Sequence, residues 1–298
     1  MAISAGMVKD LREKTGVGMM ECKKALEENA GDMEKAIVWL RERGMSRAAK
    51  KEGRVTAEGI VEVYVNPAKD AGVLLEVNCE TDFVSKNEQF QKFTKDLAEL
   101  ALKSKASNVS ELEHLKLGSE TVKERLANLI ATIGENMQLR RVQVVSTTNG
   151  VVSGYSHMGG RIGTLVAVEG AKGADVEELG KDLAMHVAAA GPRYLSNTEV
   201  DTAELDLEKE IARKKLLEEG KKPEMIEKIL VGQMSKFYKE VCFLEQGFIK
   251  DPNVAIAKHV DNTKKGAKIS AFARFQLGEG IEKKKENFAE EVAAQLKK

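Results

Sequence analysis

The sequence contains two copies of one unit, and this duplication restricts the fold more than any other feature. Gly59-Ile60-Val61 and Gly150-Val151-Val152 each come before a tyrosine, a glycine and an apolar stretch at the same spacing. A similarity confined to such a block indicates a repeated structural unit. We therefore expect two related units, in each of which strands are followed by a helix.

The two copies differ where the strand passes into the helix. Both resume with Lys-Asp-Leu-Ala, but Val77 precedes Lys95 by 18 positions whereas Val168 precedes Lys181 by 13. Copy one therefore has an enlarged loop at residues 78–85. Loops at such junctions often carry function on a rigid scaffold, so we predict that this loop is the working part.

Composition restricts the class of partner. The 298 residues are enough for two or three domains. Lys and Arg together number 47, as do Asp and Glu, so no net field draws the chain to nucleic acid or to an anionic membrane. We expect a protein partner, with no direct nucleic-acid contact and no membrane contact.

Cysteine usage and hydropathy indicate the compartment. The three cysteines are far apart and lack C-x-x-C spacing, which favours reduced thiols over disulfides or a zinc site. No run approaches the roughly 18 apolar residues of a membrane span, and the N-terminus has no signal-peptide core. These features predict a cytoplasmic protein.

Residues 1–55 are predicted to be an N-terminal helical bundle and linker. Ser4 can cap a first helix that Gly16 ends, and Asp32 can cap a third. So small a bundle favours an adaptor, with a purely structural bundle as the alternative. Residues 46–56 are basic and polar, which favours a solvated linker; contact with a phosphate or an acidic helix is the alternative.

Copy one is assigned to residues 56–146. Strands are predicted at 59–65 and 73–79, and alternation along the second predicts one buried face. Ser85 and Glu88 have the spacing of a capping box for the next helix. A second helix, interrupted by Gly134, and a strand at 139–145 complete this copy.

Copy two is assigned to residues 147–200 and 248–280. Its hairpin turn is His157–Gly163, its helix runs from 176 to 190, and a strand at 269–275 completes the sheet. Residues 201–247 have the pattern of an inserted helical hairpin with a narrow apolar seam, typical of a coiled coil. This arm is a candidate surface for a homodimer, and bracing of the core is the alternative. Residues 281–298 predict a C-terminal amphipathic helix.

The motifs of common catalytic sites are absent from the sequence. No phosphate-binding loop and no G-x-G-x-x-G after a strand occurs, and the four histidines are scattered without a metal-binding or nucleophile motif. We therefore expect no cofactor and no metal, and a protein that is not an enzyme.

With these residues identified, the chain resembles the bacterial translation elongation factor Ts family, the nucleotide exchange factors of the GTPase elongation factor Tu. The resemblance covers nearly the whole length and includes Thr81-Asp82-Phe83-Val84. Six stretches carry it, in this order: Thr15 to Leu26, Glu76 to Val84, Ile133 to Asn136, His157 to Gly163, Met185 to Ala189 and Arg274 to Glu282.

The resemblance implies an α+β fold with a ubiquitin-associated-like bundle, two related α/β core subdomains, a coiled-coil arm and a C-terminal helical module. It also implies binding to GDP-bound and nucleotide-free elongation factor Tu. Thr81, Asp82 and Phe83 would enter the GTPase near its nucleotide pocket and disturb its magnesium and phosphate-binding elements. The expected partner-binding residues are Thr81, Asp82, Phe83, Val84, His157, Ile133, Gly134 and Lys23.

Alternatives remain at each of these points. Phe83 could fold onto the hairpin while Asp82 only starts a helix, and His157 could be only a turn residue. For the whole chain, the rival is an adaptor without exchange activity that binds another protein or an RNA. Neutral charge and the lack of a basic aromatic sheet face count against RNA. A metabolic enzyme lacks a recognisable site.

Overall fold

The computed structural model describes residues 3–282, which form two compact units. Among the described residues, the first unit comprises 3–62, 75–142 and 276–282, and the second comprises 63–74 and 143–275. Helices and antiparallel strands occur together, in agreement with an α+β fold. The boundaries between the two units fall inside strands, so they do not coincide with the domain limits expected from the sequence. Those limits stay predictions.

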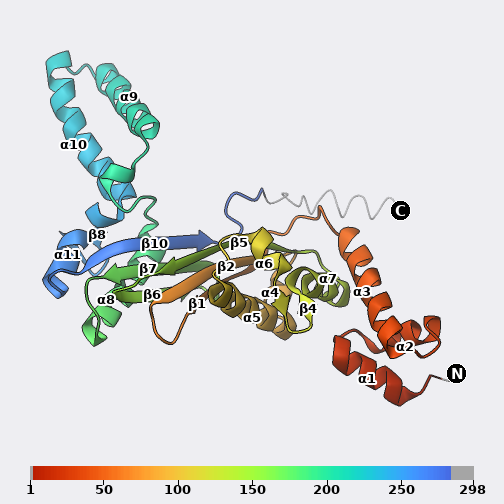
Figure 1. Ribbon diagram of the computed structural model, residues 1–298. Coiled ribbons are helices and arrows are strands. Elements are labelled where there is room, and N and C mark those ends of the chain that lie inside the picture. Colours follow the sequence, from red (N-terminus) through yellow and green to blue (C-terminus); the bar gives the residue numbers. More distant parts are fainter. Residues whose placement is uncertain (1–2, 283–298) are drawn as a thin grey trace. The chain divides into compact units, whose positions relative to one another are not determined.

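Three N-terminal helices belong to the first unit: α1 (Ala5–Thr15), α2 (Met19–Glu28) and α3 (Met33–Ala49) (Figure 1). The predicted end signals are confirmed. The Ser4 side chain accepts a hydrogen bond from the Met7 N–H, Asp32 accepts one from the Lys35 N–H, and Gly16 ends α1 with a left-handed backbone. The helices share a core that includes Leu11, Cys22, Leu26, Ala36 and Leu40.

The sheet of copy one has the order β1-β2-β5, from β1 (Glu58–Val65), β2 (Ala71–Cys79) and β5 (Met137–Ser146). The prediction that β2 has one buried face is wrong. Glu76 and Asn78, on the face expected to be solvated, are both fully buried. A carboxylate is tolerated there because Arg140 and Arg141 pair with Glu76, so its charge is compensated.

Copy one also contains α4 (Asp82–Ser85), α5 (Glu88–Ser104), α6 (Val109–His114), β3 (Lys116–Leu117), β4 (Glu120–Thr121) and α7 (Val122–Ile133). The predicted capping box of Ser85 and Glu88 is wrong. Ser85 lies inside α4 and donates its hydroxyl to the Asp82 carbonyl, and Asn87 caps α5 instead. Gly134 ends α7 in the left-handed conformation, as expected.

Copy two repeats the strand order of copy one. β6 (Gly150–His157), β7 (Ile162–Glu169) and β10 (Lys268–Gln276) form a sheet with the order β10-β7-β6. Here β7 and β10 take the places that β2 and β5 have in copy one. Helix α8 (Ala174–Ala190) packs against β6 and β7 (Figure 1). The equivalent order supports the duplication inferred from the sequence.

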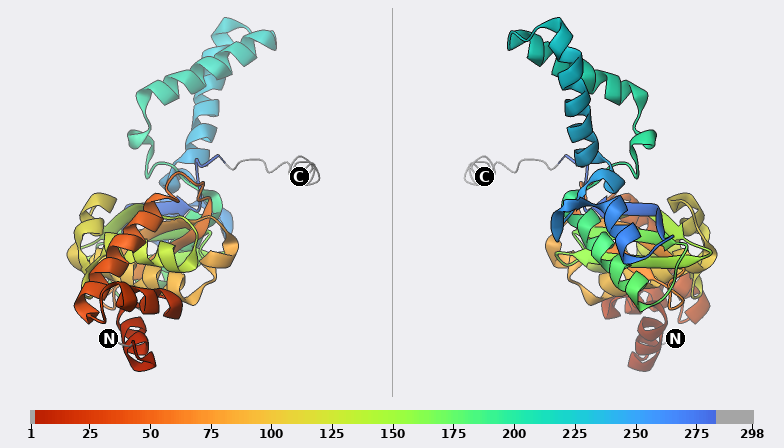
Figure 2. Two further views of the ribbon diagram at one scale, coloured as in Figure 1. Left: turned by 90° about the vertical axis from the view of Figure 1, so that its right-hand side faces the viewer. Right: turned by 90° about the vertical axis from the view of Figure 1, so that its left-hand side faces the viewer.

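Between α8 and β10 the second unit contains the arm and a small set of elements around its base. The arm is a helical hairpin of α9 (Thr202–Glu218) and α10 (Pro223–Val241), which pack through Leu216, Ile226 and Leu230 (Figure 2). The other elements are η1 (Asn197–Glu199), η2 (Phe243–Glu245), β8 (Gly247–Phe248), β9 (Asp251–Ala255) and α11 (Ile256–Thr263). Apart from residues 281 and 282, the predicted C-terminal helix lies outside the described residues.

Candidate functional site

The enlarged loop of copy one presents an aromatic side chain to solvent. Its residues form a single helical turn, α4, with Thr81 as the N-cap. Val84 points inward and is buried, whereas Phe83 is 80% exposed, the largest fraction among the exposed large hydrophobic side chains of the described residues. The alternative in which Phe83 folds onto the hairpin is therefore wrong for this structure. Asp82 forms an ion pair of 2.8 Å with Lys86.

Thr81 is fixed by a glutamate that is distant in the sequence. Its N–H donates to Glu135 Oε2 at 3.0 Å, and its hydroxyl donates to Glu135 Oε1 at 2.7 Å. The same hydroxyl accepts a hydrogen bond from the Val84 N–H at 3.5 Å. Hydrogen bonds to an ionised carboxylate are roughly twice as strong as neutral ones, so Glu135 restrains the first residue of the loop.

A second glutamate, Glu80, lies on the loop and accepts a hydrogen bond from the segment after α7 that carries Glu135. Glu80 Oε1 accepts a hydrogen bond of 2.5 Å from the Asn136 N–H and lies 3.4 Å from Arg54 Nη1. The side-chain amide of Asn136 in turn donates to the Arg54 carbonyl at 3.0 Å. The loop, the segment after α7 and the residues after α3 are therefore joined at one place.

Cys79 adds a contact beneath the loop. Burial, together with the negative charges of Glu135 and Glu58, raises the pKa of the Cys79 thiol to about 12. The thiol therefore keeps its proton at neutral pH and donates it to the Thr81 carbonyl at 3.1 Å. Cys79 thus acts as a buried structural thiol that helps to orient Thr81.

Ile133 and Gly134 lie at the end of α7, directly before Glu135. Gly134 is exposed, Ile133 is half-buried, and the Lys51 ammonium donates to the Gly134 carbonyl. The interpretation of residues 46–56 as a solvated linker is correct only in part, because residues 52–55 are exposed but the Lys51 and Arg54 side chains also contact copy one. Helix α3 runs to Ala49, and beyond it Lys51 contacts a carbonyl and Arg54 a carboxylate of copy one.

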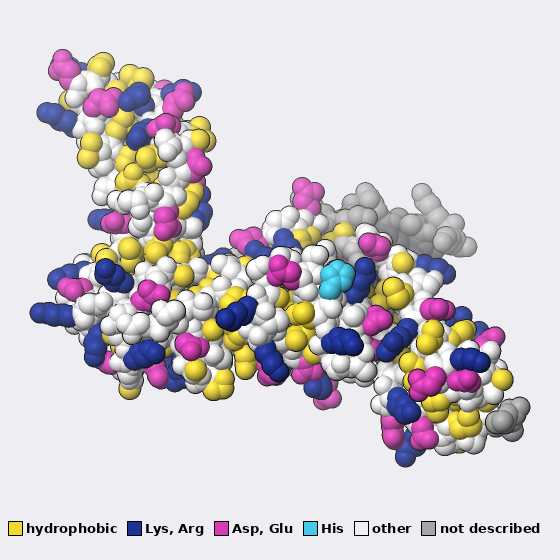
Figure 3. Space-filling model, in the orientation of Figure 1, with side chains coloured by type: hydrophobic (Ala, Val, Ile, Leu, Met, Phe, Trp, Pro, Cys, Tyr) yellow, Lys and Arg dark blue, Asp and Glu magenta, His cyan; other side chains and the backbone are white. Residues whose placement is uncertain are grey.

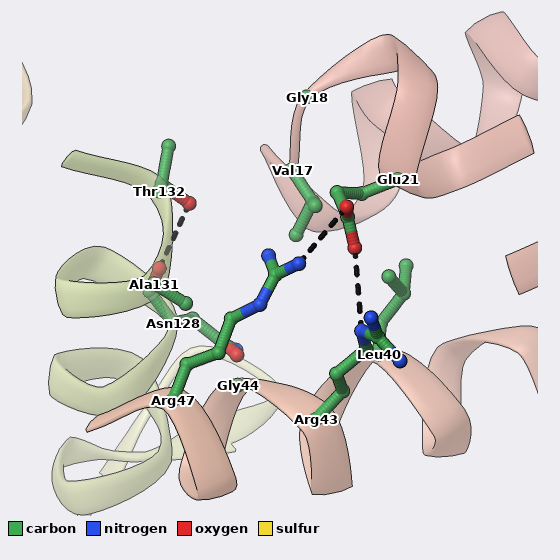
Figure 4. Close-up of a pocket in the computed structure, with 10 residues that line it drawn as sticks. All are labelled: Val17, Gly18, Glu21, Leu40, Arg43, Gly44, Arg47, Asn128, Ala131 and Thr132. Carbon is green, nitrogen blue, oxygen red and sulfur yellow. Dashed lines mark hydrogen bonds and ion pairs between the residues drawn. The ribbon is translucent and has the colours of Figure 1, made fainter. Parts of the chain in front are cut away.

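The N-terminal bundle meets α7 at a small pocket within the first unit (Figure 4). Glu21 lies there between two arginines of α3, 2.9 Å from Arg47 Nη2 and 3.6 Å from Arg43 Nε. Gly44 permits a close approach, because a Cβ at this position would lie 2.7 Å from Asn128 Oδ1. The ion pairs of Glu21 therefore join α2 to α3, and the absence of a side chain at Gly44 lets α3 pack closely against α7.

Lys23 lies on α2 of this bundle. Its side chain is exposed and pairs with Glu27 at 3.6 Å, and Met20 on the same helix is 76% exposed. An exposed lysine beside an exposed methionine is compatible with a binding face, and nothing in its own contacts requires Lys23 for folding.

His157 belongs to the second unit, at the turn between β6 and β7. It is exposed, and its Nδ1 lies 3.0 Å from the Tyr155 hydroxyl. Met158, the next residue, is also exposed and has a positive φ of 51°. The turn therefore presents two side chains outward.

The structure brings some of the predicted residues together and leaves others apart. Thr81 to Val84 lie on one loop, and Glu80 and Glu135 connect it to Ile133 and Gly134. Lys23 lies in the bundle and His157 in the other unit. The predicted site lacked Glu80, Glu135, Asn136 and Arg54. The first three fall within sequence stretches of the resemblance, but their pairing across more than fifty residues left no local signal.

Acidic and basic side chains are interspersed over the face shown in Figure 3. Within residues 3–282, no cluster of three or more histidine, cysteine or carboxylate residues could hold a metal ion. No helix in this part of the chain is both long and apolar enough to span a membrane.

Comparison with known proteins identifies the family. A family model described as elongation factor TS matches residues 80–279. An elongation factor Ts of Clostridium botulinum is 51% identical over 302 aligned positions, which cover 99% of this chain and 100% of that protein. One from Magnetococcus marinus is 49% identical, with 98% of each chain covered. With relatives this similar over almost its full length, the chain belongs to the elongation factor Ts family.

Proposed function

We propose that this protein is the guanine nucleotide exchange factor of elongation factor Tu, and that it accelerates GDP release so that GTP can bind. The observation that carries the proposal is the exposed Phe83 on a loop whose first residue is fixed by Glu135. A rigidly presented aromatic is typical of an interface anchor that enters a pocket of its partner. Membership of the family named elongation factor Ts supports the choice of partner.

The mechanism follows from thermodynamic linkage. An exchange factor binds the nucleotide-free GTPase more tightly than the GDP-bound form, and the coupling is reciprocal, so factor and nucleotide weaken each other. In the proposed complex, Thr81, Asp82 and Phe83 disturb the elements of the GTPase that hold magnesium and phosphate. The factor supplies no acid, base or nucleophile, so it is not an enzyme and needs no cofactor of its own.

Phe83 is not sufficient by itself. Accelerating GDP release by about 10³ to 10⁵ requires roughly 4–7 kcal/mol of barrier lowering, whereas burying one aromatic side chain contributes about 1.5–3 kcal/mol. The remaining binding energy must come from other surfaces. We assign this role to Lys23 and its bundle, to Ile133 and Gly134, and to the turn at His157. We propose also that the bundle is ubiquitin-associated-like, that the arm packs as a coiled coil, and that the factor acts in the cytoplasm.

The experiment measures release of a fluorescent GDP analogue from elongation factor Tu in excess unlabelled GDP, with increasing amounts of this protein. We expect saturable acceleration that Phe83→Ala and Asp82→Ala reduce. Ile249→Ala is a matched control, because Ile249 lies between β8 and β9, outside the loop, the bundle and the arm, and is 48% exposed, so its truncation also removes exposed apolar surface. Unaccelerated release with folded wild-type protein would favour the adaptor. Exchange unaffected by both loop substitutions would refute the role of the loop.

A further inference from the structure

Glu80 and Thr81 of the loop are hydrogen-bonded to Asn136 and Glu135 after α7. In one pair the loop residue accepts the bond, and in the other it donates. Glu80 accepts from the Asn136 N–H at 2.5 Å, whereas the Thr81 N–H donates to Glu135 at 3.0 Å. We call Glu80, Thr81, Glu135 and Asn136 the loop clamp. Each carboxylate thus satisfies a backbone N–H of the opposite segment, so neither segment can shift along the other without breaking a charge-assisted hydrogen bond.

We infer that the loop clamp sets the direction of Phe83, and that Glu135 is a positioning residue for nucleotide exchange. The inference rests on the proposed function and adds to it the group that keeps the loop ready for binding. Glu135 acts through Thr81 and the backbone of α4, and it is not assigned a contact with the GTPase.

The burial of the loop shows why such a group is needed. Phe83 is 80% exposed, so contacts of its own side chain contribute little to its orientation. Helix α4 has only four residues, and isolated helices far longer than this are marginal in water. The orientation of Phe83 therefore depends on Thr81, the N-cap of α4. The hydroxyl and the N–H of Thr81 both donate hydrogen bonds to Glu135.

The segment after α3 contacts residues of the loop clamp and the neighbouring Gly134. Arg54 Nη1 lies 3.4 Å from Glu80, the Arg54 carbonyl accepts from Asn136, and Lys51 donates to the Gly134 carbonyl. These contacts fix the segment that carries Glu135 as well as the loop. A loop ordered before it meets its partner loses less conformational entropy on binding, which favours both affinity and correct placement.

The central variant is Glu135→Gln, which keeps the shape of the side chain but removes its charge and one acceptor oxygen. Glu135 follows the C-terminal end of α7, and a matched control exists at the N-terminal end of this helix. There Thr121 donates its N–H at 2.8 Å and its hydroxyl at 3.0 Å to Glu124. Glu124→Gln therefore weakens the same kind of threonine–glutamate pair away from the loop.

We expect Glu135→Gln to lower the maximal rate of GDP release about tenfold, since small misplacements of a working group have effects of this order. The half-saturating concentration should change much less, because the other binding surfaces are intact. Glu124→Gln should leave the maximal rate within about twofold of wild type, as expected for a site that acts only on stability. Equal effects of the two substitutions would overturn the inference.

The double variant Glu135→Gln with Phe83→Ala shows whether Glu135 acts by positioning Phe83 or by stabilising the protein in general. If Glu135 acts through Phe83, the effect of Glu135→Gln on the maximal rate should nearly disappear when Phe83 is already alanine. A full additional tenfold loss in that background would show that Glu135 acts independently of Phe83 and would refute the inference.

A spectroscopic measurement tests the order of the loop directly. Trp39 is the single tryptophan of the chain, so Trp39→Phe with Phe83→Trp places the only tryptophan at the tip of the loop. We expect its fluorescence anisotropy to fall when Glu135→Gln is added and to remain unchanged with Glu124→Gln. Unchanged anisotropy with Glu135→Gln would contradict the inference even if exchange were slowed. Failure of the wild-type protein to accelerate GDP release would instead count against the proposed function.

Discussion

Gly59 and Gly150 approach the neighbouring strand of their sheets in the same way. A Cβ on Gly59 would lie 2.1 Å from the Val77 carbonyl oxygen, and one on Gly150 would lie 2.0 Å from that of Val168. These residues also correspond to each other in the two copies of the sequence. The duplication is therefore preserved as a close backbone approach in both sheets, at a distance that no side chain permits.

Gly59→Ala and Gly150→Ala should each lower the free energy of unfolding by about 2–4 kcal/mol, because the backbone must move to admit a methyl group. Urea denaturation measures the loss. Gly232→Ala is the control, since Gly232 lies in α10 with open space around it. There alanine should raise the free energy of unfolding by about 0.5–1 kcal/mol. If all three substitutions behaved alike, the close approach would not matter.

The buried ion pairs of Glu76 should make Arg141 important for stability. Arg141 Nε lies 2.6 Å from the Glu76 carboxylate, which is fully buried. Arg141→Met should cost about 3 kcal/mol of unfolding free energy, because it leaves a buried charge poorly compensated. Arg213→Met removes an exposed pair with Glu227 and should cost less than about 1 kcal/mol. Thermal denaturation of the two variants gives the comparison.

Glu76 should also contribute to acid sensitivity. Burial would raise the pKa of its carboxyl, but hydrogen bonds from the Gly278 N–H, Arg141 and Arg140 outweigh burial and hold the pKa below the ordinary value of 4.5. The folded state thus binds a proton less readily than the unfolded state. The contribution of Glu76 is complete above pH 4.5 and is lost as the pH falls through its folded pKa. Glu76→Gln should make stability less dependent on pH below 4.5 in denaturant titrations.

His186 should make the base of the arm sensitive to mild acid. It is buried, its Nδ1 accepts from the Ile249 N–H at 3.2 Å, and its Nε2 lies 2.9 Å from Gln246 Oε1. These two bonds fit only the neutral ring with its proton on Nε2. Burial lowers the pKa of His186 below its ordinary value of 6.5, with the Gln246 hydrogen bond acting in the opposite direction.

Because the folded pKa is depressed, the unfolded state binds the proton first, and stability falls as the pH drops below about 6.5. Comparing the midpoints of urea unfolding at pH 7 and pH 5 measures this loss. His186→Gln should reduce the difference between the two pH values. An unchanged pH dependence in the His186 variant would contradict the assignment.

Phe83 should matter for exchange and not for folding. Its exposed position predicts that Phe83→Ala changes the free energy of unfolding by less than about 0.5 kcal/mol. Phe90→Ala, by contrast, removes a fully buried ring of α5 and should cost about 3–5 kcal/mol. Denaturation and GDP-release assays on the same preparations test both statements. A clear loss of stability in Phe83→Ala would mean that the ring packs onto the protein in solution.

The arm should mediate self-association. Leu207, Ile211 and Val231 are large apolar side chains on α9 and α10 that are more than half exposed. We expect sedimentation velocity to show a concentration-dependent dimer that Ile211→Lys or Val231→Lys dissociates by placing charge in the interface. Lys228→Glu alters charge on the arm without changing its apolar residues and serves as the control. A monomer at all concentrations would favour the alternative that the arm only braces the core.

Local chemistry explains which parts of the fold were predictable. The ends of α1 and α7 follow from Gly16 and Gly134, because only glycine adopts the left-handed backbone there at little cost. The loop was found because an insertion into one copy of a repeat is visible in the sequence alone. Such signals are present in the sequence itself, either in neighbouring residues or in the comparison of its two copies.

Two kinds of failure occurred. Ser85 has the spacing of a capping residue, but it lies in α4, and its near neighbour Asn87 caps α5. The buried charge of Glu76 depends on arginines of another strand. Spacing within one segment cannot reveal such partners, which exist only once the chain has folded.

The last described part of the chain completes both units. Strand β10 joins the sheet of copy two, and two residues later the Gly278 N–H donates to Glu76 at 2.8 Å in the first unit. During synthesis from the N-terminus, the loop clamp can form once Asn136 has emerged, long before either of these contacts. A chain that stops before Lys268 would therefore present its loop while lacking a strand of one unit and a donor to a buried carboxylate of the other.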